Sequence, residues 1–198
     1  CPVANKYQIG SAVSQTAYIS HHTAMEYYGV CDQVYYDVYV SSETPFKEFE
    51  FDGYTYCYVA SKCKLGIENV HYSGGVRITD KERTTLDSIK DMDKISGIEE
   101  VLANIDGFTS LNEEKLTGYL QEYHNQFLYQ KTGFILYPYR DKLGLSHSFF
   151  EMCQSKTGKS KRYLTKEFTN GTYIKEWKLV VPDEIYKLKN GAFQDDRI

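Results

Sequence analysis

The chain has 198 residues and a net charge of −4, with 41% hydrophobic and 25% charged residues. This is the composition of an ordinary globular protein, large enough to bury a core without disulfides or metals. The total charge does not favour nucleic-acid binding by the chain as a whole. No apolar run approaches the roughly 20 residues that a membrane-spanning helix needs.

Two residue types have unusual counts. Five cysteines are widely spaced, which is typical of reduced thiols, so we expect a cytoplasmic protein. Nineteen tyrosines are present, and tyrosine suits both half-buried sheets and binding surfaces because it joins an apolar ring to a hydroxyl. A tyrosine-rich core and exposed tyrosines at an interface both remain open.

The first half of the chain predicts two short helices followed by strands. The first helix covers 5–15, and the second begins at the N-cap Ser20 and ends at Gly29, which can adopt the left-handed conformation. Asp52-Gly53 separates two strand-like runs and predicts a type I′ hairpin, in which both turn residues have positive φ. The expected strands are 34–41, 46–51, 54–59 and 76–79.

The second half is mostly helical. Thr79 and Glu82 have the spacing of a capping box, and Ser96 can cap the next helix. Further helices are expected around 116–123, 125–136 and 146–154, before a basic loop at 155–160 and strand character at 172–181. The expected fold class is therefore α+β, with a mostly antiparallel sheet and a cluster of about five to seven helices.

Three segments, in the same order along the chain, resemble the AbiEi family of bacterial antitoxins. The segments are 18–29, 76–87 and 116–136, and the second, with the sequence VRITDKERTTLD, is the most specific. The motif positions that carry the resemblance are Ser20, Ala24, Gly29, Arg77, Glu82, Arg83, Thr84, Leu86, Asp87 and Gly133.

The resemblance implies a regulatory protein of a type IV, abortive-infection toxin–antitoxin system that acts in phage defence. Residues 1–198 would form a single antitoxin-type C-terminal domain that neutralises a nucleotidyltransferase-like toxin, directly or indirectly. In the full-length protein, an N-terminal winged helix-turn-helix would bind operator DNA and repress transcription. We expect this winged helix to be absent here, because the chain starts at Cys1-Pro2 and no recognition-helix pattern precedes Asn5.

Enzyme and metal chemistry find little support in the residue pattern. Cys57 and Cys63 are six positions apart, and the tandem His21-His22 points to opposite sides of a helix, so we expect buried thiols and surface imidazoles. Arg83 and Asp87 are spaced for a helical ion pair worth roughly 0.3–0.5 kcal/mol. We therefore expect no enzyme activity, catalytic residue, metal, cofactor or small-molecule substrate.

Charge is unevenly distributed along the chain. Residues 80–122 carry 11 acidic and 5 basic side chains, whereas 138–168 carry 3 acidic and 7 basic. The basic set either is a solvated surface or binds an acidic partner or a phosphate backbone. The second alternative favours another function, a nucleic-acid-binding accessory domain in which exposed tyrosines contact bases. The candidate binding residues are Arg140, Lys142, Lys156, Lys159, Lys161, Arg162 and Lys166.

Overall fold

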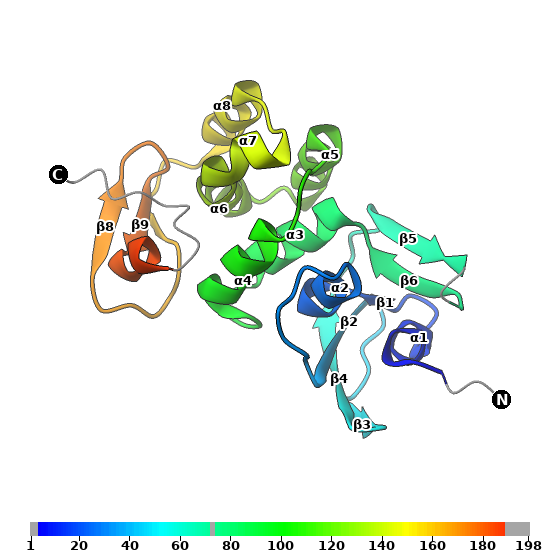
Figure 1. The fold of residues 1–198 in the computed structure, drawn as a ribbon. Coiled ribbons are helices and arrows are strands. Elements are labelled where there is room, and N and C mark those ends of the chain that lie inside the picture. Colours follow the sequence, from blue (N-terminus) through cyan, green and yellow to red (C-terminus); the bar gives the residue numbers. More distant parts are fainter. Residues whose placement is uncertain (1–3, 72–73, 189–198) are drawn as a thin grey trace. The chain divides into compact units, whose positions relative to one another are not determined.

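The structure is a computed structural model that describes residues 4–71 and 74–188 (Figure 1). The chain divides into two compact units, Cys1–Asp87 and Ser88–Ile198. Both contain helices and a sheet, which confirms the predicted α+β class. The assignment of 1–198 to a single antitoxin-type domain stays a prediction. Within the described ranges, no helix combines the length and apolarity needed to cross a membrane.

A mixed six-stranded sheet organises the first unit, in the order β3-β4-β2-β1-β6-β5. The antiparallel pairs are β1–β2, β3–β4 and β5–β6, and the parallel pairs are β1–β6 and β2–β4. Two of these strands, β1 and β5, were not predicted from the sequence. The strands are β1 (Tyr18–Ile19), β2 (Asp37–Ser42), β3 (Phe49–Phe51), β4 (Tyr54–Ala60), β5 (Ile67–Val70) and β6 (Val76–Thr79).

Two short helices pack on this sheet. Helix α1 (Lys6–Ala12) contacts β1, β2 and β6, and α2 (His21–Tyr27) contacts β2. Gly10 allows α1 to lie close, because a Cβ there would be 2.7 Å from Cδ1 of Ile19. Ile19, Val38 and Val40 are fully buried in the core beneath these helices.

Several predicted turns and helix ends in the first unit are confirmed. Asp52 and Gly53 have φ of 51° and 78°, as a type I′ hairpin requires. Asn5 forms a capping box at the start of α1, although the helix ends at Ala12 rather than at 15. Gly29 follows α2 with φ of 71°. Ser20 occupies the N-cap position of α2, but its hydroxyl does not bond to the helix backbone.

The predicted capping box at Thr79 and Glu82 is wrong. Helix α3 (Lys81–Lys90) begins one residue later, and the Asp80 carboxylate accepts a bond from the backbone N–H of Arg83 at 2.8 Å. Thr79 is still the last residue of β6, and its hydroxyl lies 2.7 Å from the hydroxyl of Thr84. Aspartate is a strong N-cap residue, so it replaces threonine in this role.

The second unit contains the predicted helical cluster. Side chains of Asn112, Asn125 and Ser146 cap three of its helices, which begin at Glu113, Gln126 and His147. Ser96 precedes α4 without a side-chain cap. Beyond α3, the helices are α4 (Gly97–Asp106), α5 (Glu113–Tyr123), α6 (Gln126–Leu136), η2 (Tyr137–Tyr139), α7 (Arg140–Leu143), α8 (His147–Lys156) and η3 (Asp183–Lys187).

A small three-stranded sheet completes the second unit, in the order β7-β9-β8. Its strands are β7 (Arg162–Tyr163), β8 (Gly171–Ile174) and β9 (Leu179–Pro182). The strand character at 172–181 belongs to two antiparallel strands, β8 and β9, separated by a turn in which Lys178 has φ of 50°. The helix predicted to stop at 154 continues to Lys156, so the basic loop starts later than expected.

Candidate functional site

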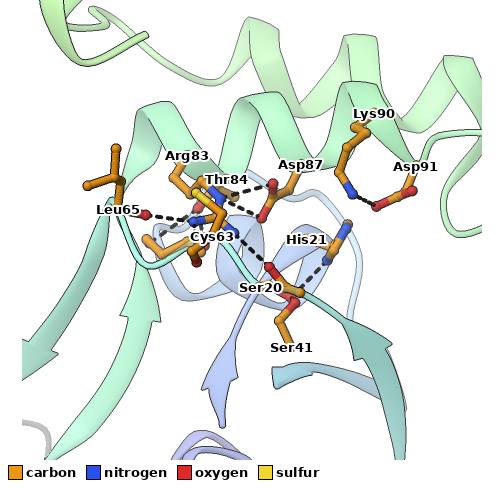
Figure 2. A network of polar contacts seen from close by, with 12 residues as sticks. Ser20, His21, Ser41, Cys63, Leu65, Arg83, Thr84, Asp87, Lys90 and Asp91 are labelled. Carbon is orange, nitrogen blue, oxygen red and sulfur yellow. Dashed lines mark hydrogen bonds and ion pairs between the residues drawn. The ribbon is translucent and has the colours of Figure 1, made fainter. Parts of the chain in front are cut away.

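The segment with the most specific resemblance carries a fully buried arginine (Figure 2). Nε of Arg83 donates to the two carboxylate oxygens of Asp87 at 3.0 and 3.1 Å. Nη1 donates to the carbonyl oxygens of Cys63 at 3.1 Å and Leu65 at 2.6 Å. The predicted ion pair is therefore present, but the energy expected for an exposed pair does not apply, because both partners are removed from water.

The third nitrogen of this guanidinium reaches β1. Nη2 of Arg83 donates to Oη of Tyr18 at 3.0 Å and to Oγ of Ser61 at 3.2 Å. Tyr18 in turn donates to Ser61 at 2.7 Å. Burial raises the pKa of Tyr18, so its phenol remains a protonated donor at neutral pH. We call Tyr18, Ser61, Cys63, Leu65, Arg83 and Asp87 the Arg83 framework; it joins strand β1, the 61–65 segment and helix α3.

A cavity of about 260 Å³ lies beside this framework. Tyr18, Ser61 and Arg77 contribute polar atoms to its lining. Nη2 of Arg77 donates to the carbonyl oxygens of Ser11 and Ser14 at 2.8 and 2.7 Å. These polar groups are engaged in bonds that hold the fold, so we assign the cavity no ligand.

The histidines of the first segment are buried, which contradicts the expected surface imidazoles. His21 is 1% exposed and His22 is 5% exposed. The hydroxyl of Ser20 lies 2.8 Å from Nδ1 of His21 and 2.7 Å from the hydroxyl of Ser41 (Figure 2). The ring of His22 stacks on Tyr35 with centroids 4.1 Å apart. Helix α2 packs against β2, and its first residues are buried. Both imidazole rings are therefore removed from solvent.

Further motif positions are buried. Ala24 and Leu86 are fully buried, and Glu82 is 6% exposed. Gly133 lies on α6 against the ring of Trp177, where a Cβ would come within 2.1 Å of Cζ3. Glycine at 133 therefore sets how closely the β8–β9 turn approaches α6.

The basic residues predicted as a binding surface fall into two groups. Arg140 and Lys142 lie on α7, where Arg140 sits 4.6 Å over the ring of Tyr137 and Lys142 pairs with Asp106 at 2.9 Å. Lys156 lies in the last turn of α8, a favourable place for a cation near the helix carboxyl end. These contacts give Arg140 and Lys142 local roles, and the position of Lys156 favours the end of its own helix.

The other basic residues lie around β7. Lys159, Lys161, Arg162 and Lys166 are all exposed. The guanidinium of Arg162 lies 5.8 Å from the ring centre of Phe127 on α6. These four residues therefore lie on or next to the edge strand β7. No contact described in residues 138–168 joins them to Arg140 or Lys142.

A buried lysine on α6 was not predicted. Lys131 is 4% exposed, and its Nζ donates to the carbonyl oxygen of Lys90 at 2.9 Å, at the end of α3. Burial lowers its pKa to about 8, although Asp93 and Asp91 favour the charged form. The apolar residues on both sides of it, Leu128 and Phe134 to Leu136, were the available signal.

The described cysteines are buried or half-buried free thiols. Cys63 and Cys153 are buried as expected, Cys31 and Cys57 are half-buried, and Cys1 lies outside the described residues. Burial raises the pKa of Cys57 and of Cys153 to about 12, so neither provides a thiolate nucleophile near neutral pH. Among the side chains of 4–71 and 74–188, no three His, Cys, Asp or Glu groups are placed to hold a metal ion.

Comparison with known proteins gives a likeness of fold. No family model matches the chain. No curated protein matches it either. The chain is similar to the crystal structure of the RV2827C protein from Mycobacterium tuberculosis, with a TM-score of 0.60 and 12% identity. That likeness covers 83% of this chain and 62% of the other, so the chain spans less than two thirds of the length of this structural relative.

Proposed function

We propose that this chain is the C-terminal antitoxin domain of an AbiEi-type regulator, with no active site of its own. It neutralises a nucleotidyltransferase-like toxin in the bacterial cytoplasm. In the full-length protein, a winged helix-turn-helix binds the operator and represses the operon. The proposal names one partner for this chain, the toxin, reached directly or indirectly.

The observation that carries the proposal is the role of the motif residues in the fold. Arg77 and Arg83 donate hydrogen bonds to backbone carbonyls, and Asp87 forms an ion pair with Arg83. The absence of a side chain at Gly133 leaves room for the ring of Trp177. Residues that hold elements together are the ones by which distant members of a family resemble one another. A motif made of such residues supports membership of a structural family and gives no support to an enzyme.

The test is rescue of growth in cells. The chain is co-expressed with the nucleotidyltransferase-like protein encoded beside it, and colony counts are compared with an empty vector. We expect growth to be restored by the wild-type chain and lost with Arg83→Met, which removes the buried cation. Lys64→Gln is the matched control, because Lys64 forms an exposed ion pair with Glu43 at 3.3 Å. Toxicity that persists while the wild-type chain is folded and abundant would contradict the proposal.

A second experiment tests whether the basic residues from the end of α8 to β7 take part in neutralising the toxin. The variant combining Lys156→Gln, Lys159→Gln, Lys161→Gln and Arg162→Gln keeps the buried framework of the first unit intact. Loss of rescue with normal folding would place the toxin-directed surface in 156–162. Full rescue would remove these cations from the antitoxin mechanism and leave them for another role.

A further inference from the structure

The small sheet of the second unit carries one row of side chains across its three strands. Tyr163 of β7 and Tyr173 of β8 are both paired with Val180 of the central strand β9. Residues paired across neighbouring strands point to the same face of a sheet. The two tyrosines therefore flank Val180 on one face, which we call the Tyr163–Tyr173 face.

This face presents aromatic rings to solvent. Tyr163 is 51% exposed and Tyr173 is 48% exposed, whereas Val180 between them is 8% exposed. The ring of Phe168 stacks on Tyr163 with centroids 6.0 Å apart and planes 25° apart. Single exposed tyrosines are common, but tyrosine rings gathered on one face are typical of surfaces that bind a partner.

The opposite face of the sheet holds it against α6. Arg162 and Leu179 are paired on that face, and Arg162 lies over Phe127 of the helix. Gln130 of α6 donates to the backbone carbonyls of Trp177 at 2.7 Å and Lys178 at 3.0 Å. Alternation along the strands then directs the Tyr163–Tyr173 face away from α6. The two tyrosines therefore lie on strands of a sheet that is held against α6, and not on a loop.

The segments that carry this face are rich in basic residues. Lys161 Nζ lies 5.7 Å from the ring centre of Tyr163, and Lys159, Lys166 and Lys175 are exposed nearby in the sequence. From 156 to 178 the chain has seven basic and two acidic side chains, against a net charge of −4 for the whole chain. The local field therefore favours a polyanion although the total charge does not.

We propose that the Tyr163–Tyr173 face binds single-stranded nucleic acid, with bases stacked on the tyrosine rings and phosphates paired with Lys159, Lys161 and Lys166. Ring faces beside cations are the combination that single strands need, because an unpaired base exposes a ring for stacking. In a duplex the bases are already stacked on one another, so a duplex would use the cations alone. This inference is independent of the antitoxin proposal.

The test is fluorescence anisotropy of the full chain with labelled 12-nucleotide oligo-dT, oligo-U and a DNA duplex. We expect both single strands to bind more tightly than the duplex, and the preference between them identifies DNA or RNA as the ligand. Tyr163→Ala and Tyr173→Ala should each weaken single-strand binding about tenfold, because each removes one stacked base. Tyr163→Phe keeps the ring and should retain binding.

A matched control is Tyr137→Ala, which removes a tyrosine that is 39% exposed on η2, outside the sheet. It should leave binding unchanged. Lys161→Gln and Lys166→Gln should each reduce the slope of log K against log salt by about 0.7, a readout that does not depend on the tyrosine variants folding.

Four results would overturn the inference. One is no binding of either single strand at low salt. The second is binding of the duplex at least as tight as that of the single strands. The third is a loss of binding in Tyr137→Ala equal to that in the sheet variants. The fourth is preferential binding of a poly-glutamate peptide through the same residues, which would make an acidic protein the ligand.

Discussion

Two arginines with the same charge have opposite surroundings in the two units. Arg83 of the first unit is fully buried and donates to Asp87, to two backbone carbonyls and to two hydroxyls. Arg162 of the second unit is exposed on an edge strand beside exposed lysines. A buried cation has exchanged water for fixed partners, so its removal disturbs the fold. An exposed one keeps most of its contact with water, so its removal disturbs the fold much less.

The largest expected effect is that of Arg83→Met. Removing one member of a buried ion pair leaves Asp87 charged and without its guanidinium, which typically costs about 3–5 kcal/mol. The free energy of unfolding is measured by urea denaturation. Arg83→Met/Asp87→Leu should recover part of the loss, since no uncompensated charge remains. Lys64→Gln should cost below about 1 kcal/mol, and an equal cost for Arg83→Met would abolish the contrast between buried and exposed cations.

The next largest effect on stability is expected where the ring of Trp177 packs against Gly133 of α6. Gly133→Ala should destabilise by about 1–3 kcal/mol, because the new Cβ would meet the Trp177 ring and force it to move. Gly118→Ala is the control on α5, where a Cβ meets nothing within 4 Å. That change should stabilise by about 0.5–1 kcal/mol through helix propensity. Thermal unfolding of the two variants should therefore shift in opposite directions.

Lys131 is intermediate between the two arginines, because it is buried but can lose its proton. Its pKa is about 8 in the folded state and near 10.5 in the unfolded one. Between these values the unfolded chain holds more protons, so raising the pH favours folding; below pH 8 both states are protonated and the effect is constant. Relative to Lys131→Met, the wild type should gain on the order of 2 kcal/mol from pH 7 to pH 10.

Urea denaturation of the wild type and of Lys131→Met at each pH isolates the contribution of Lys131 ionisation to stability. Tyrosine and cysteine ionisation at alkaline pH affects both proteins equally and cancels in the difference. A difference in stability that does not change with pH would show that the amine keeps its proton in the folded protein.

The smallest expected effect on stability is that of the exposed lysines. Replacing Lys159, Lys161 and Lys166 by Gln should change the free energy of unfolding by no more than about 0.5 kcal/mol each. A variant that combines these three replacements should lose most of its binding to single-stranded nucleic acid. A marked loss of stability would mean that these cations hold the small sheet together, as Arg83 holds the first unit.

Features set by neighbouring residues were predictable from the sequence. The Asp52-Gly53 hairpin and the close of α2 at Gly29 each depend on residues within one turn. The side-chain caps were less accessible, because Ser20 and Ser96 make no cap bond and Asp80 takes the place of Thr79. The helical cluster was as accessible as the hairpin, because its apolar spacing repeats over several turns. These local features were sufficient to predict the α+β class.

Features set by distant residues were not predictable. Strand β1 has two residues and exists only through pairing with β2 and β6. The burial of Arg83 depends on partners at 18, 61, 63 and 65, and the spacing to Asp87 revealed only one of them. The basic set was predicted as one group, but helix α7 gives Arg140 and Lys142 contacts of their own.

The Arg83 framework also has a consequence for the order in which the first unit assembles. Arg83 and Tyr18 are 65 residues apart in sequence, and the guanidinium loses its water only when β1, the 61–65 segment and α3 are all present. An intermediate lacking any one of them leaves the guanidinium in water without its full set of protein partners, so the last closure completes all three contacts together. We expect the backbone amides around 18–19, 61–65 and 83–87 to exchange hydrogen at similar rates, through one shared opening.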